Sequence, residues 1–98
     1  MKGRVEKRFQ ARKLRAFVIR HPLGHLCGYV EIPKGHPAHG VAVAVMGRIS
    51  PDITYTGTGI ISGRWLVGFH TADYPQPVYK IMERLTSLAE IMDEIGRA

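Results

Sequence analysis

Apolar and polar residues alternate in short runs along most of the chain before Pro77, and breaks rich in glycine and proline separate the runs. A period of two is typical of β-strands, because successive side chains point to opposite faces of a sheet. The breaks at 21–24, at 33–37 and from Gly47 onward have the composition of turns. The pattern therefore predicts strands at 14–20, 27–32, 41–45, 52–57 and 64–69.

Two segments need a closer look. In VAVAV (41–45) three valines share one face and two alanines share the other, which suits a strand with one core face and one closely approached face. TGTGIISG (56–63) lies between two predicted strands, and it lacks the strand-to-helix context that phosphate-binding loops require. We therefore expect a hairpin turn at 56–63 and no phosphate site.

The period changes to steps of three and four from Pro77, which is typical of a helix with one apolar stripe. We predict a helix at about 77–95, with Pro77 at its first position and Gly96 just past its end. The stripe is interpreted as core, because a small sheet needs a helix on one face. The stripe consists of Val78, Ile81, Met82, Leu85, Leu88, Ala89, Met92 and Ile95.

Together these elements predict an α+β fold, a small antiparallel sheet of about five strands with one C-terminal amphipathic helix packed on it. The 98 residues show no internal repeat, low-complexity tract or linker, so we expect residues 1–98 to form a single domain. Trp65 and Phe69 have the same parity in their predicted strand and are expected in the core.

The formal net charge of +6 is concentrated at one end of the chain. Residues 1–20 carry eight basic side chains and one acidic side chain, whereas residues 21–98 carry six basic and seven acidic ones. The basic N-terminal segment, about 1–15, is either an arm that attracts phosphates or an acidic protein, or an edge strand protected by its charges. We predict that the partner-binding residues are Arg8, Arg12, Lys13, Arg15 and Arg20.

Four of the five histidines and the only cysteine lie in HPLGHLCGYVEIPKGHPAHG (21–40). Their spacing matches no established zinc pattern, and a proline and a glycine interrupt any helix that would pair the first two histidines. We therefore expect no metal and no cofactor, and we interpret the histidines as residues that hold turns through ring hydrogen bonds. The weak candidates for metal ligands are His25, Cys27, His36 and His39.

Catalytic signals are weak as well. A Cys27–His25 pair on one strand would be too widely spaced for reliable thiolate activation, and nothing identifies a third, orienting residue. Asp52 and Asp73 are isolated in the sequence and do not form a carboxylate pair. We predict that the protein is not an enzyme. A single cysteine favours a reducing compartment, and without an export signal or membrane span we expect a cytoplasmic protein with no membrane partner.

The combination RHPLGHLCGYVEIPKGHPAHG, ITYTG and RWLVGF resembles a family of small uncharacterised proteins of bacteriophages and prophage-bearing bacteria. The resemblance covers about residues 20–70 and implies a shared fold and a mobile-element origin, without an established activity. Two segments depart from the family pattern. MGRISPD (46–52) replaces a histidine-glycine-glycine stretch, and GFHTADYP (68–75) keeps only His70 of a stretch that contains cysteine and histidine.

These observations predict a phage-type accessory protein that binds a host macromolecule stoichiometrically in the cytoplasm of a bacterial host. The partner would be a host protein or ribonucleoprotein complex, such as a defence complex that the protein inhibits in an anti-CRISPR-like manner. The alternative is a nucleic-acid-binding protein that uses the basic N-terminal segment. The sequence leaves the oligomeric state open.

Overall fold

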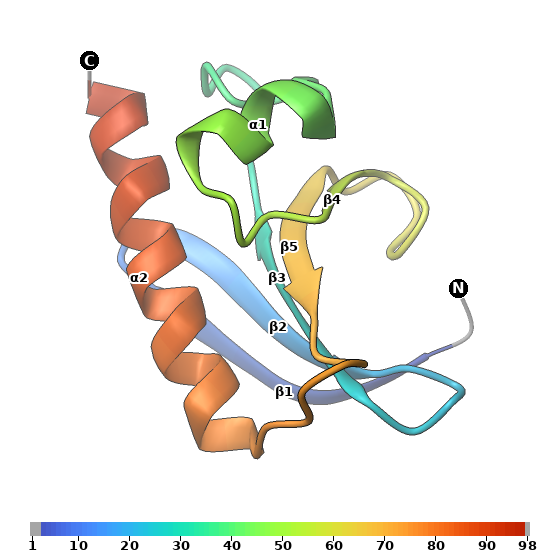
Figure 1. Cartoon of the computed structure of the whole chain (residues 1–98). Coiled ribbons are helices and arrows are strands. Elements are labelled where there is room, and N and C mark those ends of the chain that lie inside the picture. The colour runs from blue at the N-terminus through green and yellow to red at the C-terminus, as the bar shows by residue number, and fades with distance from the viewer. Residues whose placement is uncertain (1–2, 98) are drawn as a thin grey trace.

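A five-stranded antiparallel sheet with a long C-terminal helix packed on it forms the framework of the protein. The computed structural model describes residues 3–97, and Figure 1 shows the arrangement of its elements. The α+β architecture predicted from the sequence is confirmed. The elements are β1 (Arg4–Ala11), β2 (Leu14–Arg20), β3 (Leu26–Glu31), α1 (Val43–Ile49), β4 (Tyr55–Gly57), β5 (Leu66–His70) and α2 (Val78–Arg97).

The strands lie in the order β1-β2-β3-β5-β4, and every neighbouring pair is antiparallel. β1 and β2 form a hairpin whose turn is Arg12 and Lys13, with Ala11 opposite Leu14. β3 pairs with β5, so the chain from 32 to 65, which contains α1 and β4, is inserted between two adjacent strands. β4 pairs with β5 across TGIISG, which confirms the predicted hairpin.

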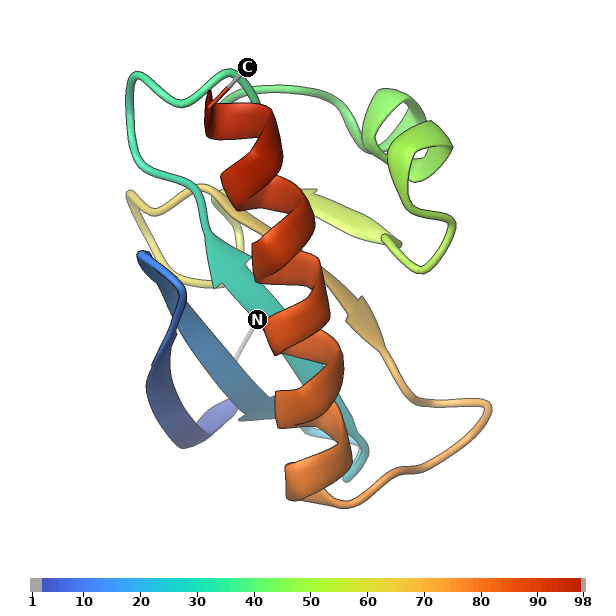
Figure 2. The ribbon, with the colours of Figure 1, turned by 90° about the vertical axis from the view of Figure 1, so that its left-hand side faces the viewer.

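One face of the sheet, which we call the helix-side face, packs against α2 (Figures 1 and 2). Alternate residues of the strands supply this face, and the helix contributes residues at steps of three and four. Gly28 lies beneath the helix, where an added Cβ would come within 2.8 Å of Phe69 Cζ and 2.9 Å of Ile81 Cγ2. Close approach of α2 therefore requires a glycine there. The buried contacts include Ala16, Val18, Val30, Val67, Phe69, Ile81, Leu85, Leu88, Ala89 and Met92.

The opposite face, which we call the loop-side face, has a smaller apolar cluster. The loop that leads to β5 covers this cluster, and Tyr55 of the edge strand β4 packs edge-on against Tyr29 with 5.8 Å between ring centroids. The Tyr55 hydroxyl accepts a hydrogen bond from the backbone N–H of Gly59, which ties the loop to its own strand. The buried members of the cluster are Phe17, Ile19, Cys27, Tyr29 and Leu66.

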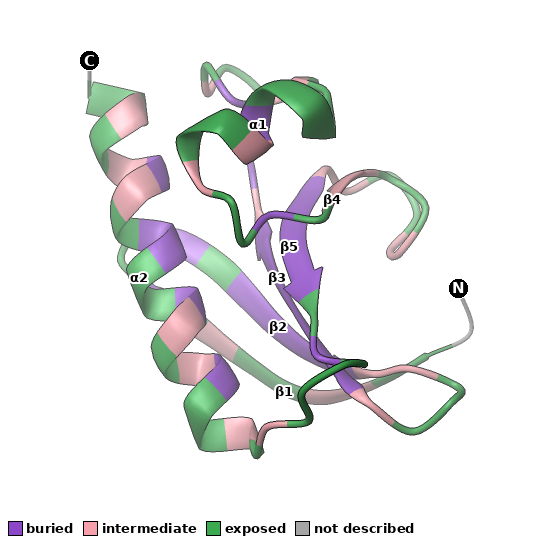
Figure 3. Cartoon of the chain, in the orientation of Figure 1, coloured by how far each residue is buried: buried purple, intermediate pink, exposed green. Residues whose placement is uncertain are grey.

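The prediction of a strand at 41–45 was wrong, because Val43–Ile49 form the helix α1. Both neighbours of β3 and of β5 are already other strands, so this segment has no interior strand position to occupy. Met46 is the one residue of α1 that is buried, while Val45 and Ile49 remain 51% and 48% exposed. Much of the α1 ribbon is accordingly coloured as exposed in Figure 3. A single buried side chain per two turns is compatible with a helix, and alternation of valine and alanine does not exclude it.

Residues 4–11 of the basic segment form the edge strand β1, one of the two alternatives that the sequence left open, and Met1 and Lys2 lie outside the described residues. Several boundaries differ from the prediction. The strands predicted at 52–57 and 64–69 are Tyr55–Gly57 and Leu66–His70. Pro77 is not in the helix, and its carbonyl accepts hydrogen bonds from the N–H groups of Lys80 and Ile81. Gly96 lies inside α2, which continues to Arg97. The glycine is needed for packing rather than for ending the helix, because His36 lies against it.

Candidate partner-binding site

The loop-side face is hollowed between the β1–β2 hairpin and the loop that precedes β5. The cavity has a volume of about 410 Å³ and is open to solvent on one side. Three of its lining side chains are arginines, and the buried ring of Phe17 contributes to its floor. We call this cavity the basic hollow, and it is lined by Arg8, Phe9, Gln10, Arg15, Ala16, Phe17, Ile61 and Arg64.

Strand register explains why these side chains converge. Arg8 is directly opposite Phe17, and Gln10 is directly opposite Arg15. Opposite residues of an antiparallel pair point to the same face, and so do residues two apart along one strand. The hairpin therefore sets two arginines beside the Phe17 ring on the loop-side face.

Arg64 reaches the hollow from the other side and is held in place by an ion pair. Its Nη1 donates a hydrogen bond of 2.8 Å to Oε1 of Glu31, at the end of β3. Neither the Arg8 nor the Arg15 side chain makes a hydrogen bond or an ion pair with another residue of the described range 3–97. Two exposed guanidinium groups are thus available for a carboxylate or phosphate, which they can bind through paired N–H donors.

The five predicted partner-binding residues do not form one surface. Arg8 and Arg15 lie together in the hollow. Arg12 occupies the hairpin turn with φ of 58°. Its guanidinium pairs with Glu90 of α2 at 3.4 Å, so a carboxylate of the same molecule partly neutralises its charge. Lys13 follows it in the turn and is exposed.

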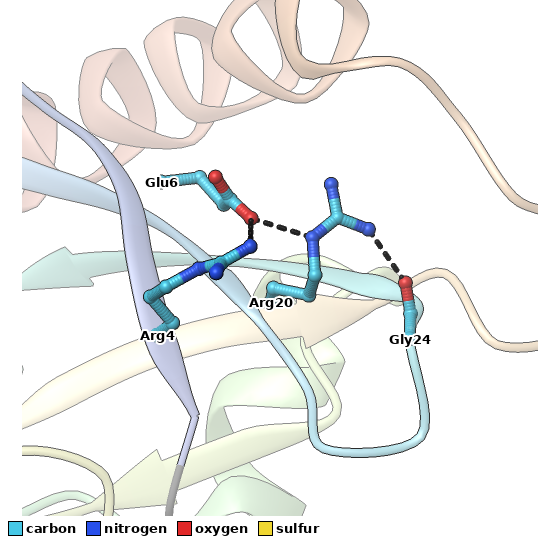
Figure 4. Close-up of polar contacts among 4 residues, drawn as sticks. All are labelled: Arg4, Glu6, Arg20 and Gly24. Atoms are coloured by element: carbon cyan, nitrogen blue, oxygen red, sulfur yellow. Dashed lines mark hydrogen bonds and ion pairs between the residues drawn. The ribbon is translucent and has the colours of Figure 1, made fainter.

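Arg20 has a structural role at the far end of the hairpin (Figure 4). Its Nε donates to Oε1 of Glu6, and its Nη1 donates to the carbonyl of Gly24 at 2.7 Å. Arg4 also donates to the same Glu6 oxygen. These hydrogen bonds, first from Arg20 and then from Arg4, lower the pKa of Glu6 below its ordinary value. Arg20 is therefore occupied in holding β1, β2 and the following turn together.

Sequence reasoning missed Arg64, whose position depends on a loop that folds back over strands almost fifty residues earlier in the chain. No local pattern distinguishes it from the other arginines. Its acidic neighbour Glu31 is 33 residues away in sequence, so only tertiary structure brings the pair together.

The four weak metal candidates are divided between two ends of the molecule. His25 and Cys27 lie near His21 and His70, around a second cavity of about 390 Å³ on the loop-side face. His36 instead lies against the C-terminal turns of α2. Residues 3–97 contain no group of three or more histidine, cysteine, aspartate or glutamate side chains that could hold a metal ion. His36 lies at Met92 and His39 lies at Trp65, so neither joins His25 and Cys27 in one ligand set.

Two of the four histidines in 21–40, His21 and His36, make the ring hydrogen bonds predicted for them. Nδ1 of His36 accepts a hydrogen bond of 3.0 Å from the N–H of Ala38, so Nε2 carries the proton and donates it to the carbonyl of Met92 at 2.8 Å. His21 accepts in the same way from the N–H of Leu23 at 3.0 Å. His39 lies beside Trp65, with 5.6 Å between ring centroids. The His36 ring thereby fastens the turn after β3 to the helix.

The second cavity is lined by closely spaced histidine rings. His25 stacks on His21 with 4.4 Å between centroids and meets His70 edge-on at 6.3 Å. Desolvation, followed by repulsion from His21 and His70, lowers the pKa of His25. Burial raises the pKa of the Cys27 thiol, which is 2% exposed. A buried thiol with a raised pKa, near an imidazole with a lowered pKa, is poorly suited to nucleophilic catalysis.

Comparisons with family models, with curated proteins and with solved structures produced no match to this chain. Within residues 3–97, no helix combines the length and the apolar character needed to cross a membrane. The basic hollow is the feature of the described chain in which unpaired charge, an aromatic floor and a concave surface coincide.

Proposed function

We propose that this protein is a phage-type accessory protein that binds an acidic surface of a host protein or ribonucleoprotein complex stoichiometrically. Such binding would inhibit a bacterial defence complex in an anti-CRISPR-like manner within the host cytoplasm. The observation that carries the proposal is the basic hollow, where unpaired Arg8 and Arg15 flank an apolar floor. The motif resemblance in residues 20–70 supports the phage-type origin.

The shape of the hollow favours a protein partner over a nucleic acid. Phe17 is 5% exposed, so its ring face is not open as a platform on which a base would stack. Arg12 and Arg20, which would extend the charge along a phosphate backbone, already pair with Glu90 and Glu6. A carboxylate on a partner surface, next to an apolar group, matches two guanidinium groups beside Phe17 and Ile61.

The proposal involves binding and no chemical step. It draws on the raised thiol pKa of Cys27 and on its burial, both of which disfavour a nucleophilic role. It also draws on the hydrogen bonds that commit both ring nitrogens of His36 to backbone groups. A binding protein needs neither group to react.

The test is capture of partners from a nuclease-treated bacterial lysate by the wild-type protein and by two variants of equal charge. Arg8→Glu/Arg15→Glu reverses the hollow, whereas Lys34→Glu/Arg48→Glu reverses two exposed charges that do not line it. We expect one protein or complex to be retained in stoichiometric amount by the wild type and the control and lost from the hollow variant. Equal retention by all three proteins would contradict the proposal.

The nucleic-acid alternative is tested separately with random duplex and single-stranded DNA at two salt concentrations, by fluorescence anisotropy. If phosphate contacts dominated, each lost contact would reduce the salt slope of log K by about 0.9 on duplex DNA. We expect the wild type and Arg8→Glu/Arg15→Glu to bind both kinds of DNA only at background level. Sub-micromolar, salt-dependent binding that disappears in Arg8→Glu/Arg15→Glu would instead establish the alternative.

A further inference from the structure

β1 leaves a long, unpaired edge beside the basic hollow. It is the first strand in the order β1-β2-β3-β5-β4, and no other described residue of 3–97 forms a strand on its outer side (Figure 2). β1 has eight residues, whereas β4, at the opposite edge, has three. An edge strand presents backbone N–H and C=O groups that can pair with an extended segment of another chain.

The hairpin geometry identifies which backbone groups point outward. In a hairpin with a two-residue turn the closing pair, here Ala11 and Leu14, exchanges hydrogen bonds. Hydrogen-bonded and non-hydrogen-bonded pairs then alternate along the hairpin, so the backbone groups of Gln10 and Arg8 point away from β2. The side chains of these same two residues line the basic hollow.

Irregularity limits the usable edge to its C-terminal half. The register of β1 shifts between Val5 and Lys7, which interrupts the regular spacing of backbone groups there. Glu6, at this irregularity, is engaged by two arginines. The regular part, from Lys7 to Ala11, is the part that adjoins the hollow.

We propose that an extended acidic segment of the partner adds to the outer edge of β1 as an antiparallel strand. Its residues opposite Arg8 and Gln10 carry carboxylates, which point onto the loop-side face toward Arg8 and Arg15. The residue opposite Arg8 would lie about 5.5 Å from it at Cα, within reach of a guanidinium-carboxylate contact. Arg15 lies across β1 from the added strand, two strand spacings or roughly 10 Å from the carboxylate-bearing residue opposite Gln10, and its long side chain reaches over Gln10 toward that carboxylate. This mode of binding rests on the proposed function and specifies the partner surface as a strand with carboxylates at alternate positions.

Charge argues against a second copy of this chain as the occupant. An antiparallel pair of β1 strands would bring two sets of basic side chains, including Lys7 and Arg8, against each other. Like charges that face each other across strands destabilise pairing. An acidic strand gains from the same charges, and it supplies the amide groups that a nucleic acid lacks.

The test uses a synthetic peptide, blocked at both ends, in which glutamate alternates with threonine, and measures its affinity by calorimetry or anisotropy. In the proposed pairing the glutamate amides face β1 and the threonine amides face solvent. N-methylation of the glutamate amides removes these hydrogen bonds, and we expect it to weaken binding about tenfold or more. The matched control, N-methylated on the threonine amides, should bind like the parent peptide.

Equal affinities of the two methylated peptides, or loss only on threonine methylation, would overturn the antiparallel strand pairing. Failure of the parent peptide to bind while the hollow variant still loses its lysate partner would overturn it too, but would leave the proposed function intact. Peptide binding that disappears in Arg8→Glu/Arg15→Glu and persists in Lys34→Glu/Arg48→Glu supports the inference even if no lysate partner is found.

Discussion

The two faces of the sheet are covered in different ways. A helix of twenty residues covers the helix-side face with a continuous apolar stripe, and its contacts are almost fully buried. The loop-side face is covered only by the loop between β4 and β5, and the basic hollow remains open beside that loop. In a chain of 98 residues one long helix is enough for one face. The partly covered face is therefore where exposed charge and apolar surface meet.

The largest loss of stability is expected when core volume is removed under the helix. Leu85 is completely buried, and Leu85→Ala should lower the free energy of unfolding by roughly 2–5 kcal/mol. Urea denaturation followed by circular dichroism measures the change. A loss well under 1 kcal/mol would mean that α2 does not anchor the sheet.

Adding volume under the helix should have a smaller effect. Gly28→Ala places a Cβ within 2.8 Å of Phe69 and 2.9 Å of Ile81, and such overpacking costs about 1–3 kcal/mol. Gly47→Ala is the matched control. Gly47 lies in the helix α1, and the nearest atom to its added Cβ would be the carbonyl oxygen of Ile53 at 3.8 Å. There the substitution should stabilise the protein by up to about 1 kcal/mol. Similar destabilisation by both would contradict the close approach at Gly28.

On the loop-side face the same kind of truncation should cost less. Ile61 is half-buried at the edge of the basic hollow, so Ile61→Ala removes less shielded apolar surface than Leu85→Ala and should cost about 1 kcal/mol or less. The same denaturation experiment gives the value. A cost equal to that of Leu85→Ala would show that the two faces contribute alike.

The smallest expected effect is the dependence of stability on pH through His25, on the loop-side face. The pKa of His25 is lower in the folded protein than its ordinary value near 6.5, so the unfolded chain binds more protons around that pH. Stability should therefore fall as pH decreases through and below about 6.5, and it should recover as pH rises above it. Melting temperatures between neutral and mildly acidic pH measure this, and His25→Gln should flatten the profile. An unchanged slope in that variant would assign the effect to another group.

The parts of the fold that depend on local pattern were predictable. Residues 14–20 and 27–32 alternate cleanly and form β2 and β3 within one residue of the predicted ends. The helix at 77–95 was evident from its stripe, although Pro77 precedes it and Gly96 lies within it. The strand predicted for VAVAV was wrong because a short apolar run is compatible with a strand or a helix. The interior positions of the sheet are taken by other strands, and the segment forms a helix.

The candidate site was predictable only in part. Charge density singled out Arg8 and Arg15, which lie in the basic hollow, together with Arg12 and Arg20, which acidic residues engage. A count of basic residues cannot show which of them find partners inside the same molecule. Glu90 and Glu6 pair with two of them because of how α2 and the β1–β2 hairpin pack.

By itself the sequence determined the α+β class, the hairpin at 56–63, the apolar stripe of the helix and the excess of positive charge near the N-terminus. These features depend on neighbours along the chain, where the period of apolar residues and the turn-forming residues act directly. The tertiary structure was needed to show that residues 43–49 are helical and that His25 and His36 lie in different parts of the molecule. It was also needed to show that Arg64 lines the same hollow as Arg8 and Arg15. Those outcomes depend on contacts between residues distant in the chain, which strand order and helix packing create and which no local pattern encodes.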